Sequence, residues 1–153
     1  MKKIDDFFNQ LVQHMGFLPD EVKVAVTEDD QRILVDIQVP TDDSGMVIGV
    51  GGEVLTSMQR LARTIFFNQV DKKIQVNVND YRQTRKEALE ALAERICQEV
   101  STSSEPVMIH KQLSSYERFV IHDYVASHHE ELESLSEGES DNRRLVIKKK
   151  TKV

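Results

Sequence analysis

Three of the four residues from Gly49 to Gly52 are glycines, and this G-x-x-G segment separates two stretches of helical spacing. Glycine reaches the left-handed backbone conformations of tight turns without steric cost, and a cluster of glycines ends a helix. Directly after the segment, apolar residues recur at intervals of three and four from Val54 to Phe66, which is the spacing of a helix with one buried face. The segment therefore predicts a sharp turn that opens a helix.

The elements around this turn form a mixed pattern of helices and strands. Helical spacing predicts a first helix over residues 4–15, and alternating apolar residues predict a two-stranded hairpin over 22–26 and 33–39. A short helix is expected just before the glycines, and alternation over 74–78 predicts a third strand. The first half of the chain thus reads helix, strand, strand, short helix, glycine turn, helix, strand.

The second half begins with a long helix. Its apolar residues keep helical spacing from Tyr81 to Val100, so we expect this helix to join two folded units. Beyond it, the pattern predicts a short strand at 107–109, a helix over 113–125, a loop around Gly138 and a last strand at 145–147.

Composition narrows the classes of function. With 20 basic and 26 acidic residues the formal net charge is −6, which argues against coating nucleic acid by overall charge, so any phosphate binding must be local. No apolar run approaches the roughly 18 residues that a membrane helix needs, and no signal peptide is recognisable. The one cysteine, Cys97, cannot form an internal disulfide. We therefore expect a cytoplasmic protein without membrane insertion.

Residues for catalysis or for a cofactor are not evident in the sequence. The glycine turn lacks the Gly-Lys-Ser/Thr of a Walker loop and the preceding strand of a dinucleotide site. The neighbours His128, His129, Glu130 and Glu131 carry ligand groups, but adjacent side chains point in different directions. We expect no enzymatic activity, no cofactor and no metal, and a metal-dependent hydrolase would require the histidines to converge.

The glycine turn is a candidate phosphate site. Its missing β-carbons let a nucleic-acid backbone approach, and the helix that follows presents unpaired N–H groups. The alternative is a turn that binds nothing. The order of elements over residues 1–80 resembles a type II K-homology (KH) domain, whose G-x-x-G loop clamps about four nucleotides. The resemblance assigns phosphate contact to Gly49, Val50, Gly51 and Gly52. Further along the helix, Arg60 and Arg63 are candidates for added charge, and the alternative for them is an ordinary solvated surface.

A second candidate site lies on the helix predicted over 113–125. Arg118 and His122 are four residues apart and lie away from the apolar face to which the pattern assigns Tyr116 and Val120. Both side chains are therefore expected to point outward, as a donor-rich patch suited to a phosphate. An ordinary solvated helix surface is the alternative.

The context of this pair resembles the R-three-H domain, named for an arginine and a histidine separated by three residues. The resemblance rests on residues 115–122, followed by 136–139 and 143–147, although Phe119 stands where many members have a second arginine. That domain binds single-stranded nucleic acid. The resemblance implies that Arg118 and His122 contact the strand, with Arg143 and Arg144 as neighbours across the sheet.

A type II KH domain joined by a long helix to an R-three-H domain resembles the bacterial Jag family, also called KhpB or EloR, over nearly the whole chain. We expect an α+β fold with a KH domain at residues 1–80 and an R-three-H domain at 81–153, each with helices on one face of a three-stranded sheet. The resemblance implies an RNA chaperone or post-transcriptional regulator that affects cell-envelope growth and division, often with a small KH-domain partner.

Two functions remain open at this stage. One is binding of single-stranded RNA, with single-stranded DNA as a second candidate ligand. The other is a protein-interaction adaptor that uses the KH domain to form a homodimer. A positive surface around the G-x-x-G segment and Arg118 favours RNA, whereas an acidic or apolar surface there favours the adaptor.

Overall fold

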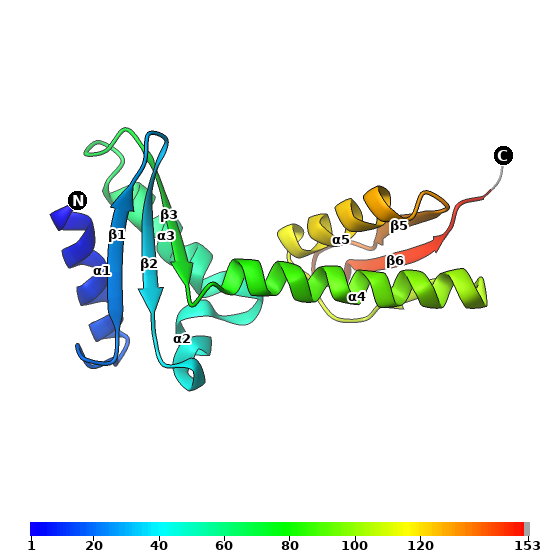
Figure 1. Ribbon diagram of the computed structural model, residues 1–153, viewed down its shortest axis with the longest axis horizontal. Coiled ribbons are helices and arrows are strands. Elements are labelled where there is room, and N and C mark those ends of the chain that lie inside the picture. Colours follow the sequence, from blue (N-terminus) through cyan, green and yellow to red (C-terminus); the bar gives the residue numbers. More distant parts are fainter. Residues whose placement is uncertain (152–153) are drawn as a thin grey trace. The chain divides into compact units, whose positions relative to one another are not determined.

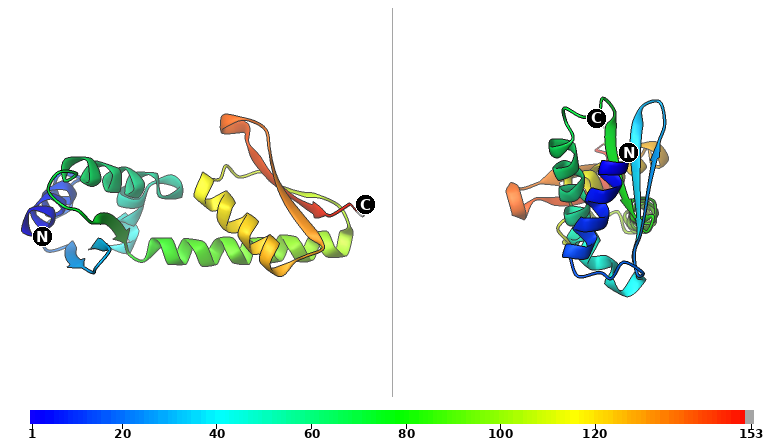
Figure 2. Two further views of the ribbon diagram at one scale, coloured as in Figure 1. Left: turned by 90° about the horizontal axis from the view of Figure 1, so that it is seen from above. Right: turned by 90° about the vertical axis from the view of Figure 1, so that its left-hand side faces the viewer.

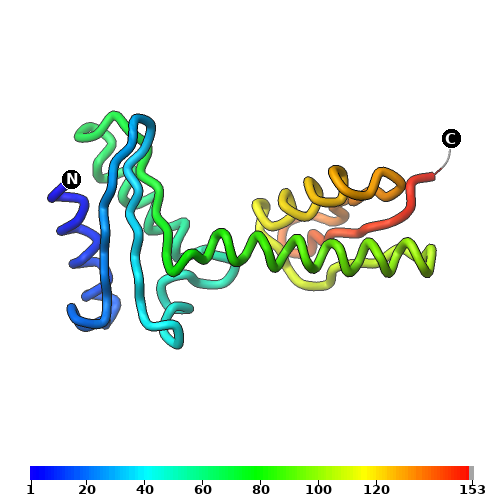
Figure 3. Tube along the Cα trace, in the orientation of Figure 1, coloured from blue at the N-terminus to red at the C-terminus, as the bar shows by residue number. Residues whose placement is uncertain are grey.

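The computed structural model describes residues 1–151 and divides into two compact units, the first of which ends at Arg82 (Figure 1). Residues 152 and 153, which close the predicted second domain, lie outside the described part. The elements of the first unit are α1 (Lys2–His14), β1 (Lys23–Glu28), β2 (Arg32–Gln38), α2 (Ser44–Ile48), α3 (Glu53–Ile65) and β3 (Lys73–Val78). This is the predicted order, and the trace in Figure 3 follows it through the glycine turn into α3.

The sheet of the first unit has the strand order β1-β2-β3. β1 pairs with β2 in antiparallel register, and β2 pairs with β3 in parallel, with Val35 opposite both Val26 and Val76. Both α1 and α3 cover one face of this sheet (Figure 2), and the buried side chains between them form the core. The parallel pairing requires the crossover through α2 and α3, so it places the glycine turn at the end of the sheet where β2 leaves it.

The outer edge of β3 is bonded to side chains. Arg63 donates from Nε to the carbonyl oxygen of Ile74 at 2.7 Å. The amide of Val76 donates to Gln59 Oε1 at 3.0 Å, and Arg82 Nε donates to the Val76 carbonyl at 3.4 Å. A strand at the edge of a sheet leaves its outward backbone N–H and C=O groups without a partner strand. These side chains supply hydrogen-bond partners to such groups on β3.

The second unit contains all but the first two residues of α4 (Tyr81–Ser103), and also β4 (Val107–Ile109), α5 (Ser115–His128), β5 (Leu132–Glu137) and β6 (Arg144–Lys149). Its strands follow the order β4-β6-β5, and both pairings are antiparallel. Buried residues of α4 and α5 pack with inward strand residues in one core. Cys97 is fully buried in α4. No helix in the described residues has the length and apolarity to cross a membrane.

Two details of the second unit differ from the sequence pattern. β5 was not predicted from alternation, because its core-facing positions include Ser134 and Ser136, opposite Ile147 and Leu145 of β6. The assignment of Tyr116 to the apolar face of α5 was wrong as well. Tyr116 is 49% exposed, whereas its neighbour Glu117 is only 3% exposed.

Candidate nucleic-acid interface

The backbone of the glycine turn explains why it needs glycine. Gly49, Gly51 and Gly52 have φ values of 75°, 60° and 81°, which lie in the region that side chains disfavour. A β-carbon at Gly49 would lie 2.6 Å from Val54 Cγ2, and one at Gly52 would lie 3.0 Å from Tyr81 Cε1. Packing around the turn therefore requires bare backbone at both outer glycines.

The accessible part of the turn is its middle. Val50 is 89% exposed and Gly51 is exposed, whereas Gly52 is buried. The amide of Gly49 donates to the Gly45 carbonyl at 2.9 Å, and the amide of Gly52 donates to the Gly49 carbonyl at 3.3 Å. These two N–H groups are thus engaged inside the turn, so a ligand would meet the segment at Val50 and Gly51.

The exposed side chains closest to the turn in the sequence are apolar or acidic. Besides Val50, Met46 on α2 is 55% exposed, and Glu53 is exposed in the first turn of α3. Arg60 is exposed on α3, about 10 Å beyond Glu53 at 1.5 Å per helical residue. No cation stands between the outer glycines, so the local surface at the turn is not the positive one that RNA favours.

The second candidate site begins with Arg118, which is half-buried in the first turn of α5. Its Nη1 donates to the Leu113 carbonyl at 2.6 Å, and its Nη2 donates to Ser115 Oγ at 3.1 Å. Because a guanidinium carries five N–H donors, these bonds fix its orientation while leaving further donors for a ligand.

His122 does not point freely outward as expected. It is half-buried against β5, with Nδ1 2.6 Å from Ser134 Oγ and Nε2 3.0 Å from Ser136 Oγ. A neutral imidazole has one donor and one acceptor nitrogen, so the two serines take opposite roles. Burial lowers the pKa of His122, and the charges of Arg118 and Arg143 lower it further. The ring is therefore neutral at neutral pH.

The structure brings Arg143 to this site but not Arg144. Arg143 is exposed at the end of the β5–β6 connection, near enough to His122 to affect its pKa. Arg144 donates from Nη1 to the Asp141 carbonyl at 2.7 Å and to the Arg143 carbonyl at 3.0 Å. Because side chains alternate along β6 and Leu145 faces the core, Arg144 belongs to the other face of the sheet.

Glu117 is a structural residue that the sequence pattern did not identify. Its Oε1 accepts from Arg85 Nε at 2.7 Å and from Arg85 Nη2 at 2.6 Å. Its Oε2 accepts from the amide of Ser114 at 2.8 Å, and the Ser114 hydroxyl accepts from the Glu117 amide, which completes a capping box. These bonds hold the first turn of α5, and with it Arg118.

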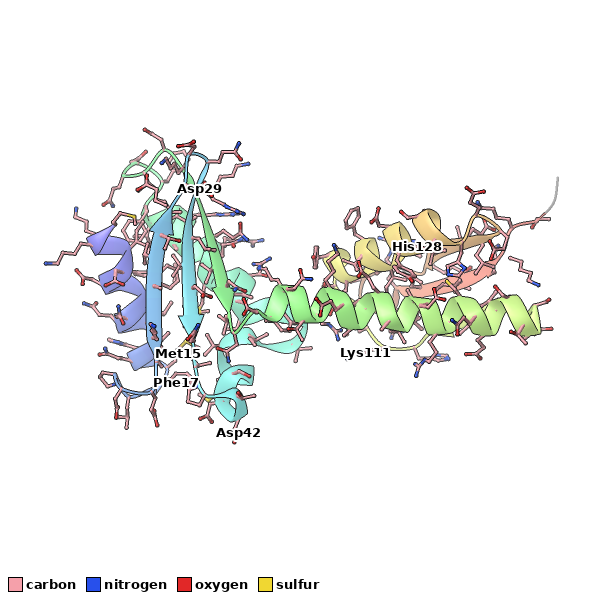
Figure 4. The ribbon with its side chains drawn as sticks, in the orientation of Figure 1. Met15, Phe17, Asp29, Asp42, Lys111 and His128 are labelled. Atoms are coloured by element: carbon pink, nitrogen blue, oxygen red, sulfur yellow. The ribbon has the colours of Figure 1, made fainter. Side chains whose placement is uncertain are left out.

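The histidines and acids further along α5 form a separate cluster. Glu94 Oε2 accepts from the Tyr124 hydroxyl at 3.0 Å and lies 2.8 Å from His129 Nε2. His128, labelled in Figure 4, stacks on Tyr124 with ring centroids 4.2 Å apart. Its neighbour His129 thus faces a different partner. Within residues 1–151, no three His, Cys, Asp or Glu side chains converge in a way that would hold a metal ion.

The two units correspond to two known domain families. A family model described as the KhpA/KhpB KH domain matches residues 2–78, and the R-three-H domain model matches residues 87–149. The second match includes both the Arg118–His122 pair and β5, the strand that alternation did not reveal.

Relatives with curated names resemble the chain over most of its length. The chain is 30% identical over 131 residues to "RNA-binding protein KhpB" of Streptococcus pneumoniae, an alignment that covers 83% of this chain and 39% of that one. Proteins of the same name from Clostridium symbiosum and Bacillus subtilis are 29% and 28% identical, over 95% and 84% of this chain and 64% and 62% of theirs. The chain thus spans between 39% and 64% of the length of these relatives. It belongs to the KhpA/KhpB family of KH-domain proteins and carries an R-three-H domain after its KH domain.

Proposed function

We propose that the chain binds single-stranded RNA and that Arg118, His122 and Arg143 carry most of the phosphate recognition. The observation that supports this is the gathering of two arginines around a half-buried histidine on the flank of α5. Arginine offers a planar donor fork that suits phosphate oxygens. His122 is neutral and adds no charge, and because both its ring nitrogens are bonded to Ser134 and Ser136, it must release one serine to bond a phosphate. The name of the relatives, RNA-binding protein, agrees with this proposal.

In this proposal the glycine turn is a weaker second site. Val50 and Gly51 offer exposed backbone that a sugar-phosphate chain can approach, but no side-chain cation assists. Two weak sites on one chain still bind a long strand well, because the second contact becomes intramolecular. Arg60 is the nearest candidate for an added charge on α3.

The test of the second unit is a titration of fluorescent single-stranded RNA over a range of salt concentrations. For single strands, the slope of log K against log salt becomes shallower by about 0.7 for each phosphate that the protein no longer neutralises. R118A should lower both the affinity and this slope, whereas H122Q should lower affinity with little change in slope because His122 is neutral. R95A is the matched control, since Arg95 is an exposed arginine of α4. Equal behaviour of R118A and R95A would contradict the proposal.

The test of the glycine turn uses its most exposed side chain. Val50 is 89% exposed, so V50D and V50K change charge without disturbing packing. Gly51 is left unchanged because of its positive φ. If phosphates approach the turn, V50D should weaken RNA binding and V50K should strengthen it. Two variants that both match the parent would remove the turn from the binding site.

A second candidate function is the protein-interaction adaptor, favoured by the apolar and acidic surface at the turn. Val50 and Met46 are more than half exposed, and Glu53 adds negative charge beside them. An adaptor that dimerises there, or that takes up a small KH-domain protein, should lose this association in V50D. Sedimentation velocity over a range of concentrations measures it, and RNA affinity should then be unchanged.

The cellular part of the proposal is an RNA chaperone or post-transcriptional regulator in the cytoplasm, linked to cell-envelope growth and division. Membership of the KhpA/KhpB family is what supports it. Ultraviolet crosslinking in cells should recover RNA with the parent chain and much less with R118A. If R118A restores normal growth and shape to a deletion strain as fully as the parent does, RNA binding at this site is not what the cell requires. Titrations with DNA of the same sequence distinguish RNA from DNA as the preferred ligand.

A further inference from the structure

Two aromatic rings are exposed on α5, next to the arginine–histidine site. Phe119 is 61% exposed and Tyr116 is 49% exposed. Aromatic side chains bury more area than most others, and their exposure on a helix needs a reason. Neither ring belongs to the core of the second unit, so neither is explained by folding.

The position of Phe119 on the helix connects it with the phosphate-binding residues. Residues three apart on a helix are surface neighbours, and Phe119 is three residues from Tyr116 on one side and from His122 on the other. Arg118 lies directly before it. Along the helix surface, the ring of Tyr116 is therefore followed by the ring of Phe119 and then by the imidazole of His122. The guanidinium of Arg118 lies at their flank.

Exposed apolar side chains on a helix are also suited to a contact with another protein, but the neighbouring residues here favour contact with a nucleic-acid base. The residues that share this exposed face with Phe119 include Ser115 and Asp123, so the rings do not extend into a broad apolar surface. Arg118, directly before Phe119, provides positive charge at the flank of the rings, and Arg143 lies near His122. A flat ring beside a cation complements a strand that presents an unpaired base and a phosphate together.

We propose that Phe119 is a base-stacking residue, on which an unpaired base of the bound strand lies while Arg118 holds a neighbouring phosphate. Tyr116 extends the platform to a second base. This inference rests on the proposed function. It adds a stacking contact with the flat face of a base to the contacts with the charged phosphate backbone. Such contacts tolerate any sequence, because every base has a flat face.

The experiment compares the full-length parent with F119L and F119W. Leucine keeps apolar volume but lacks a ring, and the chain contains no tryptophan, so F119W places a single tryptophan at the site. Each protein is titrated with a mixed-sequence single-stranded oligonucleotide and with one of equal length built from abasic spacers. F67L is the matched control, because Phe67 is 78% exposed in the first unit.

F119L should bind the base-containing strand at least about fivefold more weakly than the parent, and should bind the abasic strand equally well. F119W should keep its affinity, and its fluorescence should be quenched by the base-containing strand only. If F119L binds both strands as the parent does, or if the tryptophan is not quenched, stacking is refuted while a loss in R118A still upholds the proposed function. A parent chain that binds no single strand overturns both. Loss of self-association in F119L with unchanged RNA affinity would assign the rings to a protein contact, and so overturns the stacking proposal.

Discussion

At the scale of the residue, Glu117 combines two roles that usually fall to different side chains. It closes the capping box of α5 with Ser114, and it is the buried partner of Arg85, with a side chain only 4% exposed. A buried charge that loses its partner is costly, because nothing replaces the water it gave up on folding.

E117A should therefore destabilise the second unit by about 3 kcal/mol, near the lower end of the range for a broken buried pair because Arg85 keeps some exposure. Urea unfolding followed by circular dichroism measures this loss. The pair of Lys86 and Glu90 on the surface of α4 is the control, and E90A should cost less than about 1 kcal/mol. A double variant R85A/E117A that is as unstable as the sum of its single changes would show that the two side chains are not coupled.

Glu94 and His129 make stability depend on pH. The hydrogen bond from His129 is the main cause that lowers the pKa of Glu94 from 4.5 to about 2, and the same bond raises the pKa of His129 above 6.5. Glu94 contributes to the stability of the fold above pH 4.5, and this contribution is lost as the pH falls toward 2. His129 contributes to stability below pH 6.5, and its contribution is lost as the pH rises through its raised pKa.

The parent should therefore exceed H129Q in stability most clearly between pH 4.5 and 6.5. The difference should shrink on either side of that window. Hydrogen exchange of the β5 and β6 amides over a pH series measures it in the second unit alone, after correction for the intrinsic exchange rate. A difference that stays constant from acid to alkaline pH would refute the pairing.

At the scale of the element, the glycine turn couples local conformation to packing. G49A should destabilise the first unit by about 1–3 kcal/mol, because φ is +75° and the new methyl group would meet the backbone of Val54. Gly45, one turn earlier in α2, has open space around it, and G45A should be neutral or stabilising. Urea unfolding of the two variants gives the comparison, and an equal effect of both would remove the steric argument.

The elements that the sequence predicted are those whose buried residues are mostly apolar. The alternation of β2 and β3 and the helical spacing of α1, α3 and α4 all follow from one apolar face, and glycine marks the turn through its backbone freedom alone. The sequence pattern does not predict β5, because Ser134 and Ser136 face inward, where their hydroxyls form hydrogen bonds with His122. The burial of Glu117 is not predicted either, because the pattern cannot show that Arg85, 32 residues away, neutralises its charge.

The candidate site was predictable in part for the same reason. The spacing of four between Arg118 and His122 places them on one side of any helix, so the sequence identifies the pair. It does not show which of them faces the sheet, nor that Arg144 belongs to the opposite face, because both depend on where β5 and β6 pack. Exposure of Phe119 likewise follows only once the buried face of α5 is known.

At the scale of the whole molecule, the two cores have no residue in common within the described chain. Each unit thus has its own hydrophobic core and its own candidate site. On an RNA of about four nucleotides, the length that one KH domain clamps, either V50D or R118A leaves the other site intact. If both candidate sites bind RNA as proposed, both should contribute to one binding event on an RNA of several tens of nucleotides.

Each single substitution should therefore reduce affinity more for the long RNA than for the short one. Fluorescence anisotropy with a length series of one repeated sequence measures this. The double variant V50D/R118A gives the reference affinity of an RNA that neither site binds. Reductions in affinity that do not depend on RNA length would mean that a single site accounts for binding.

The side chains that cover the outer edge of β3 also affect how copies of the protein meet. A strand with open backbone groups is a template on which another molecule can extend the sheet. Here Gln59, Arg63 and Arg82 already bond to the backbone of Ile74 and Val76, so an incoming strand would have to break those bonds before forming its own. When the molecules are crowded together, this edge resists growth into shared sheets, and the protein is protected there against aggregation.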